Sequence, residues 1–400
     1  MKKIHYSWFI CLGCTLLMFC TAGLGSTGFS TYLPYLISMK GLANVQISMI
    51  VFVRSLFGVL SMLFVNSFLR RFEIRRVATA AMIVCSAAFM IFGFADSFIG
   101  YCIAAAIAGT AYGFGGMIPA SILISRWFND HRGLALGIVM ASTGVSTFIA
   151  SPIITVMVER LTLRSSFLIE AVFIFVAGII VWLVLRSEPA CLHTIPLGAD
   201  SEDAPQVYAD RTAARPLILI MAFGWLLLGA AANNLHSHLS VLYQSVGFDS
   251  SQISTVISLF GISLAVGKCT YGQLSDKIGL FRSCSLLFFT SLAGTAFCCM
   301  ARTSGFLLAC IAVAMVGFGM AVASVATSTF AIESATEQDY PKVVSNFQTM
   351  QTLGGLIFAT VPGFLADRTG DYILSYVIMF TLILISALLL QGTYLVIKKK

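Results

Sequence analysis

Long apolar runs, separated by short polar or charged breaks, dominate this chain of 400 residues. A helix needs about 20 apolar residues to cross the hydrocarbon core of a bilayer. The runs predict an all-α membrane protein with twelve transmembrane helices, at residues 7–37, 46–69, 77–95, 98–126, 133–158, 165–186, 216–243, 251–275, 282–301, 304–332, 343–365 and 373–396.

One polar break is much longer than the others. Residues 187–214, SEPACLHTIPLGADSEDAPQVYADRTAA, contain three prolines and several charges, which are typical of a linker. We expect this segment to be cytoplasmic and to join an N-terminal six-helix bundle, residues 1–186, to a C-terminal six-helix bundle, residues 215–400. Two halves of equal length are typical of transporters built from pseudo-symmetric repeats.

Composition agrees with this pattern. The chain is 58% hydrophobic and 10% charged, whereas an average soluble domain has roughly 25% charged residues. The net charge of +7 is spread over many short loops, so it does not form the basic patch of a nucleic-acid-binding protein. Ten of the eleven cysteines lie in apolar runs and make no metal-binding pattern, so no cofactor or metal is expected.

The basic residues predict how the chain crosses the membrane. Cytoplasmic loops of membrane proteins carry an excess of Lys and Arg. With both termini in the cytoplasm, the inner segments hold 17 of the 24 basic residues and the outer loops hold five. The predicted location is therefore the cell (cytoplasmic) membrane, crossed many times, with the N- and C-termini cytoplasmic.

The two remaining basic residues, Arg54 and Lys268, fall inside predicted helices. An ionised Lys or Arg at a helix centre costs about 2.5–3.5 kcal/mol on insertion scales, and a guanidinium group does not lose its proton in proteins. Two acids are available: Glu170 lies within a predicted helix, and Glu333 lies at the inner end of another. An interior with an excess of positive charge favours an anionic substrate.

Each cation also has a structural alternative. Lys268 has small or polar neighbours at helical spacing, including Ser254, Gly261 and Ala265, which leave room for a ligand. It could instead extend to the cytoplasmic interface, because Asp276 follows two turns later. Arg54 could contact substrate, or it could pair with Glu170 or with helix-end carbonyl groups.

Further candidates are polar side chains on neighbouring helices. Asn234 and His238 are four residues apart and project from one helix face. His238 could relay a proton or bind a carboxylate, or it could be a hydrogen-bonded structural histidine. The hydroxyl groups of Tyr32, Tyr35 and Tyr112 could line a site or anchor the helices at the membrane interface.

A short motif carries a family resemblance. The segment YGQLSDKIGLFR, residues 271–282, resembles the loop signature G-x-L-x-D-[RK]-x-G-x-x-R of the major facilitator superfamily. The first-half copy, NSFLRRFEIRRV at residues 66–77, keeps basic residues but has Arg70 at the position of the Asp. The resemblance implies the major facilitator fold and a conformational latch formed by Gly272, Asp276, Lys277, Gly279, Arg282, Arg70 and Arg71.

A narrower resemblance concerns the monocarboxylate and oxalate/formate antiporter-type porters. RWFNDHRGLALGI, residues 126–138, is similar to their connection between helices four and five, and Lys268 stands where they commonly have an arginine that engages the substrate carboxylate. The chain departs from the animal porters at Leu264, where they have an Asp, and at Tyr35, where they have a Lys. Their proton coupling through that Asp therefore does not transfer to this chain.

Together these features predict a secondary active transporter for a small organic anion, a monocarboxylate, that works by alternating access as a proton symporter or an anion exchanger. The expected partners are the lipid bilayer, the anion, and H⁺ or a counter-anion; the family resemblance implies a monomer. The predicted substrate-binding residues are Lys268, Arg54, Tyr112, His238, Asn234, Tyr32 and Tyr35, and the possible proton sites are His238 and Glu170.

Two other functions are weaker alternatives. A multidrug efflux transporter of the same fold would need acids in its cavity, and this interior offers Glu170 against two cations. A non-transporting membrane sensor would be expected to carry an added soluble domain, for which the linker is too short. The five histidines are scattered and form no clustered catalytic set, so the chain is not expected to be an enzyme.

Overall fold

The structure is a computed structural model that describes residues 5–128, 132–189, 194–198, 209, 212–303, 305–336 and 338–398. Within these residues it has helices and no β-strand, only an isolated bridge between Phe128 and Leu197. Twelve helical segments in this part of the chain are long and apolar enough to cross a membrane. The predicted all-α, twelve-helix class is therefore confirmed.

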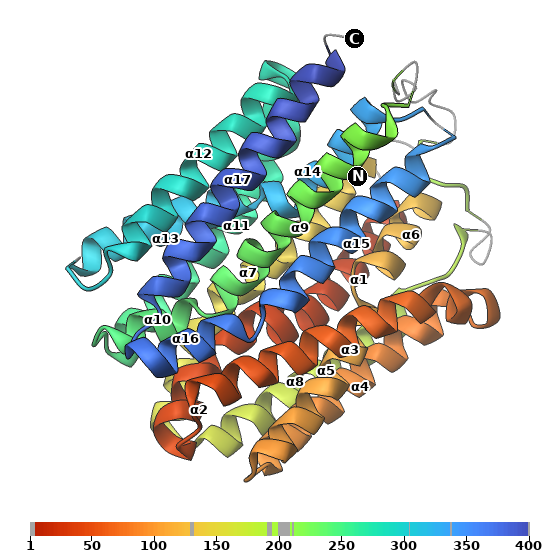
Figure 1. Ribbon diagram of the computed structural model, residues 1–400. Helices are drawn as coiled ribbons and strands as arrows, with labels where there is room; N and C mark the ends of the chain where they lie inside the picture. The colour runs from red at the N-terminus through yellow and green to blue at the C-terminus, as the bar shows by residue number, and fades with distance from the viewer. Residues whose placement is uncertain are drawn as a thin grey trace. The chain divides into compact units, whose positions relative to one another are not determined.

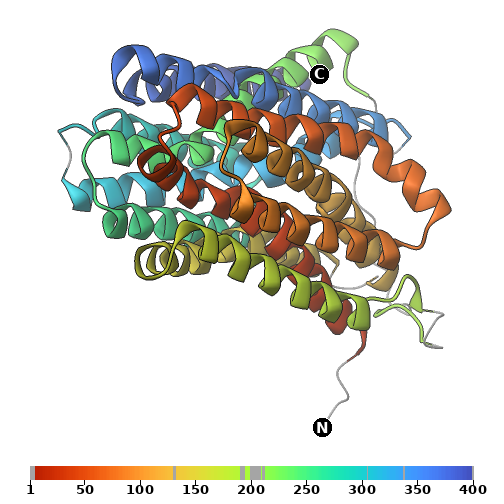
Figure 2. The ribbon, with the colours of Figure 1, turned by 90° about the horizontal axis from the view of Figure 1, so that it is seen from below.

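The described chain forms two compact units, residues 1–42 with 49–205 and residues 43–48 with 206–400. The first unit contains the elements α1 (Ser7–Met18), η1 (Phe19–Thr27), η2 (Gly28–Tyr32), α2 (Leu33–Lys40), most of α3 (Asn44–Arg71), α4 (Ile74–Phe94), α5 (Phe98–Gly115), α6 (Met117–Trp127), α7 (Arg132–Arg160) and α8 (Leu163–Val184). Helix α4 packs against both α5 and α8 (Figure 1). In Figure 2 the red first span lies between the orange and yellow-green helices of this unit.

The second unit contains the first turn of α3 and the helices that follow α8. These are α9 (Arg215–Ser237), α10 (Leu239–Ser245), α11 (Ser250–Ile278), α12 (Leu280–Cys299), α13 (Phe306–Met320), α14 (Val322–Ser334), α15 (Tyr340–Phe358), α16 (Val361–Thr369) and α17 (Ile373–Lys398). Helix α9 packs against α15 and α17, and α12 packs against α13 and α17 (Figure 1).

Several predicted spans consist of more than one helix. The fourth span breaks at Gly116, between α5 and α6, where the backbone has φ −86° and ψ −142°. The seventh predicted span breaks at His238, with φ −108° and ψ 9°, and continues as α10. The predicted boundaries of the two halves and of the linker stay predictions, since much of 187–214 lies outside the described residues.

Glycines set the closest helix contacts in each unit. A side chain at Gly109 of α5 would collide with the backbone of α3 at Arg54, and one at Gly354 of α15 would collide with the backbone of α9 at Leu226. Small residues of this kind let helices approach closely in a membrane, where packing must replace the hydrophobic driving force. The close approach of α3 to α5 fixes the position of Arg54 in the first unit.

Candidate functional site

The first membrane span leaves regular α-helical geometry in its middle. Helix α1 continues as the π-helix η1 and then as the 3₁₀ helix η2, before α2 resumes. A π-helix has i→i+5 hydrogen bonds and a 3₁₀ helix has i→i+3 bonds, and π segments are frequent at functional sites. The change of pattern near Gly25 and Ser26 leaves carbonyl groups there available to a donor from another helix.

Arg54, on α3, is the donor. Its side chain is 7% exposed, and Nη1 donates hydrogen bonds to the carbonyl oxygens of Ser26 at 3.1 Å and Gly25 at 3.4 Å. The guanidinium carbon lies 5.7 Å from the ring centroid of Phe29. Among the described residues no acidic side chain forms an ion pair with Arg54. Main-chain dipoles rather than a counter-charge therefore hold this cation.

Tyr112 lies beside Arg54. Tyr112 is on α5, and its ring packs against Gly58 of α3: a Cβ atom added at this glycine would lie 3.4 Å from the ring. Tyr112 also interacts electrostatically with Arg54. The glycine contacts between α3 and α5 bring the two residues together. The structure thus groups two of the predicted substrate-binding residues.

A second polar group in the same unit joins α8 to the first span. Glu170 is 7% exposed, and the hydroxyl of Tyr32 donates a hydrogen bond of 2.7 Å to its Oε2. The same hydroxyl lies 2.8 Å from Ser166 Oγ, and the Tyr32 ring stacks on Phe167 with centroids 4.1 Å apart. Glu170 Oε1 is buried and has no hydrogen-bond partner among the residues that the structure describes. The structure thus corrects one sequence-based alternative: Arg54 pairs with main-chain carbonyls and not with Glu170.

Further buried polar atoms in this unit lack hydrogen-bond partners within the described part of the chain. They are Tyr35 OH and Thr31 Oγ1 on the first span and Ser146 Oγ on α7. A buried polar group without a hydrogen bond costs about 1–3 kcal/mol. Atoms of this kind are available to a polar ligand or to water.

In the second unit, Lys268 is half-buried on α11. Residues on the same side of the helix, Gly261, Leu264 and Ala265, are buried, whereas the opposite side carries the exposed Val266. Gly267 packs α11 against the backbone of α13. The lysine therefore lies at the edge of the packed face and not in the middle of the exposed one.

Asn234 and His238 come together in the second unit and are used for hydrogen bonds within the protein. His238 is fully buried; its Nδ1 lies 3.0 Å from the carbonyl oxygen of Asn234 and its Nε2 lies 2.9 Å from Ser48 Oγ. Asn234 Nδ2 donates to the carbonyl oxygens of Ala230 at 2.8 Å and Gly355 at 3.0 Å. A substrate-binding role for either residue stays a prediction.

The predicted latch is described only in part. Gly279 separates α11 from α12 with a positive φ of 82°, and Lys277, Arg282 and Arg71 are exposed. The side chains of Asp276 and Arg70, and the surroundings of Gly272, lie outside the described residues. The latch therefore stays a prediction.

A polar stripe lies on α15, and sequence reasoning singled out only Gln348 of it, as a weak candidate. Ser345, Asn346, Gln348 and Thr349 are exposed although they lie in a helical segment, Lys342–Thr369, that is long and apolar enough to span a membrane. Polar side chains inside membrane spans usually face a protein interior or a water-filled cavity. The polar run VSNFQTMQT, residues 344–352, was the signal that could have revealed this stripe.

Comparisons with known proteins extend the sequence pattern. Residues 15–235 and 217–399 match the profile described as Major Facilitator Superfamily. "Monocarboxylate transporter 12" of Xenopus laevis is 24% identical over 299 residues, which are 68% of this chain and 64% of that protein. "Monocarboxylate transporter 13" of Rattus norvegicus is 25% identical over 263 residues, 65% of this chain and 59% of its own. The matches thus span less than two thirds of these relatives.

Solved structures support the same architecture. The crystal structure of nucleoside transporter NupG superimposes with a TM-score of 0.74, covers 99% of this chain and 100% of its own, and is 13% identical. At that identity the similarity shows the fold alone. The family resemblance drawn from the loop motif is confirmed.

Proposed function

Because this chain belongs to the major facilitator superfamily of membrane transporters, we propose that it moves a small organic anion, a monocarboxylate, by alternating access. The relatives named monocarboxylate transporter 12 and monocarboxylate transporter 13 agree with this substrate class. We further propose the cytoplasmic membrane as its location, with both termini inside, on the basis of the distribution of basic residues.

The observation that carries the proposal is the charge of Arg54. Its guanidinium group stays ionised, is 7% exposed, and has two main-chain carbonyl groups as its hydrogen-bond partners. Carbonyl dipoles compensate part of a full charge, so the surrounding protein keeps a positive potential. A carboxylate would neutralise the remaining positive charge of Arg54, whereas a cationic drug would be repelled by it.

Lys268 supplies a second positive charge. An ammonium group is a compact point charge that does not fix a carboxylate as the planar fork of an arginine does. We therefore expect this residue to attract the anion and to tolerate several carboxylate orientations. Tyr112, beside Arg54, and the unpartnered hydroxyl of Tyr35 would add hydrogen bonds to the substrate.

Transport is powered by proton symport or by anion exchange in this proposal. Of the two candidate proton sites, the contacts favour Glu170, because one of its carboxyl oxygens has no hydrogen-bond partner and the other accepts a bond from Tyr32. Both ring nitrogens of His238 lie within hydrogen-bonding distance of other protein groups. A proton on Glu170 would balance the entry of a monoanion.

The test is uptake of labelled lactate, pyruvate, formate and oxalate into proteoliposomes, with and without an inward proton gradient. Arg54→Gln and Lys268→Gln are expected to lower uptake at least tenfold, corresponding to about 1.4 kcal/mol of lost interaction. Lys268→Arg should retain uptake. Arg160→Gln is the control, since Arg160 is exposed on α7.

Two results would refute the proposal. One is that neither glutamine variant differs from Arg160→Gln in carboxylate uptake. The other is that expression lowers ethidium accumulation while no carboxylate is transported, which would favour drug efflux. Uptake that is unaffected by a proton gradient but stimulated by internal anion would assign exchange instead of symport.

A further inference from the structure

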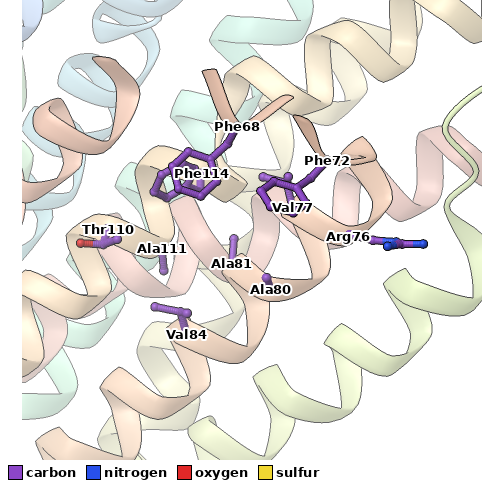
Figure 3. Close-up of a pocket in the computed structure, with 10 residues that line it drawn as sticks. All are labelled: Phe68, Phe72, Arg76, Val77, Ala80, Ala81, Val84, Thr110, Ala111 and Phe114. Carbon is purple, nitrogen blue, oxygen red and sulfur yellow. The ribbon is translucent and has the colours of Figure 1, made fainter. Parts of the chain in front are cut away.

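A hollow of about 290 Å³ lies in the first unit between α3, α4 and α5 (Figure 3). Its volume is near the lower end of the roughly 300–1,000 Å³ of small-molecule sites. Figure 3 shows the rings of Phe68, Phe72 and Phe114 together on one side and the guanidinium group of Arg76 at the edge. The lining is Phe68, Phe72, Arg76, Val77, Ala80, Ala81, Val84, Thr110, Ala111 and Phe114.

The aromatic side of the hollow is open to the surroundings of the protein. Phe68 is 45% exposed and Phe72 is 51% exposed, and Phe64, one turn earlier on α3, is 58% exposed. Exposed apolar rings of this size are unfavourable in water. Phe64 and Phe68 lie in a candidate membrane span, Asn44–Leu69, where such rings contact acyl chains, so we expect lipid to reach this hollow.

The edge of the hollow is basic. The segment RRFEIRR, residues 70–76, contains four arginines and one glutamate and so has a net charge of +3. Arg75 is engaged with Trp182, since its Nε donates to the Trp182 carbonyl at 2.7 Å and its guanidinium lies 3.9 Å over the ring. Among the described residues Arg76 makes one ion pair, an exposed one with Glu73 at 3.6 Å, and such pairs contribute little.

A ligand that matches these features is an amphiphile, with an apolar chain that fills the hollow and an anionic group that binds at its basic edge. We propose that the hollow binds one anionic phospholipid of the cytoplasmic leaflet, with an acyl chain among the phenylalanine rings and the phosphate at Arg76. Basic pockets between membrane helices on the cytoplasmic side are known to hold acidic lipid headgroups. The basic loop is cytoplasmic under the topology proposed above.

The other end of α4 provides a natural comparison. A second hollow of about 550 Å³ is lined there by Ala87, Phe94, Asp96 and neighbouring residues. The carboxylate of Asp96 pairs with Lys40 at 2.7 Å, so the charged group in that lining is an acid that is already neutralised. An anionic headgroup therefore has less to gain at the second hollow than at the first.

Native mass spectrometry of the delipidated, purified full chain tests the proposal. The probes are phosphatidylglycerol and phosphatidylcholine with identical acyl chains, titrated without any transported substrate. We expect the parent to retain one phosphatidylglycerol more tightly than phosphatidylcholine. Arg76→Gln should weaken phosphatidylglycerol binding about fivefold, as expected for one basic residue near an anionic lipid, and leave phosphatidylcholine binding unchanged.

Matched variants separate the hollow from the general lipid surface. Ala80→Leu fills the hollow from an exposed position of α4 and should weaken binding of both lipids; Ala87→Leu, two turns along the same helix face, should not. Arg160→Gln controls for the lost charge. If Ala80→Leu fails to fold, Val84→Phe fills the same hollow from the next turn.

The proposal is overturned if the parent binds the two lipids equally. It is also overturned if Arg76→Gln matches Arg160→Gln, or if the filling variant matches Ala87→Leu. None of these outcomes depends on which substrate the protein carries.

Discussion

The hydroxyl group of Tyr32 makes two hydrogen bonds inside the first unit, to Glu170 Oε2 at 2.7 Å and to Ser166 Oγ at 2.8 Å. The variant Tyr32→Phe removes this hydroxyl and keeps the ring that stacks on Phe167. Any loss of stability therefore reports the hydrogen bonds and not the aromatic packing.

The size of the effect follows from the number of bonds. Hydrogen bonds between membrane helices average about 0.6 kcal/mol and reach about 1.7 kcal/mol, so two of them are worth roughly 1–3 kcal/mol. Tyr32 is the donor to Glu170 Oε2 and Oε1 has no partner, so the variant leaves the carboxyl group without a hydrogen bond from the described residues. We therefore expect a loss in the free energy of unfolding of about 2 kcal/mol.

The measurement is equilibrium unfolding in mixed micelles, in a cycle of Tyr32→Phe, Glu170→Leu and the double variant. The two single changes should be non-additive by about 0.6–1.7 kcal/mol. Tyr35→Phe is the matched control. Tyr35 lies one turn further along, and its buried hydroxyl has no hydrogen-bond partner in the described chain, so removing the hydroxyl should not lower the free energy of unfolding. Equal losses for Tyr32→Phe and Tyr35→Phe, or additivity of the cycle, would refute the reasoning.

Three further outcomes are expected. Gly354→Ala should destabilise the protein by about 1–3 kcal/mol, because the added methyl group would meet the backbone of Leu226. Gly392→Ala is the control, since its methyl group would point into open space and should not destabilise the protein. Thermal unfolding of the two variants measures the difference. Asp96→Asn should leave the thermal midpoint unchanged, because its ion pair is exposed; a clear decrease would contradict this. Cys269, the exposed one among the described cysteines, should be labelled by a water-soluble maleimide, because we expect the face beside it to be wet. The carboxylate proposed as substrate should protect it from labelling; protection by an unrelated cation would contradict an anion site.

The fold could be predicted because membrane insertion depends on the length and hydrophobicity of apolar runs, which can be read directly from a sequence. Apolar runs such as 77–95 and 165–186 must form helices, since no other spanning structure satisfies the backbone within one segment. The structure places the corresponding helices at Ile74–Phe94 and Leu163–Val184, within a few residues. The presence of Arg54 and Lys268 inside spans was equally visible, because charged residues stand out in apolar runs.

The contacts of these charges could not be predicted, because they depend on helix rotation. The segment TAGLGSTGF, residues 21–29, is compatible with a continuous α-helix, yet it forms π and 3₁₀ turns. Each π turn contains more residues than an α turn, so it rotates the faces of all later residues, including Tyr32. Reasoning from 3.6-residue periodicity therefore gave no signal that Tyr32, and not Arg54, contacts Glu170.

The π segment and Arg54 explain one another. The segment provides carbonyl groups at Gly25 and Ser26, and Arg54 provides the donor that they need inside the membrane. Each partner lowers the cost of burying the other, which accounts for a guanidinium group that is buried without an acid. The carbonyl dipoles, however, compensate less than the full charge of the guanidinium group. An acid paired with Arg54 would compensate it fully and would leave no electrostatic potential to act on a substrate. A neutral or cationic cargo would gain nothing from the remaining potential, and this is the physical reason to expect selection of an anion.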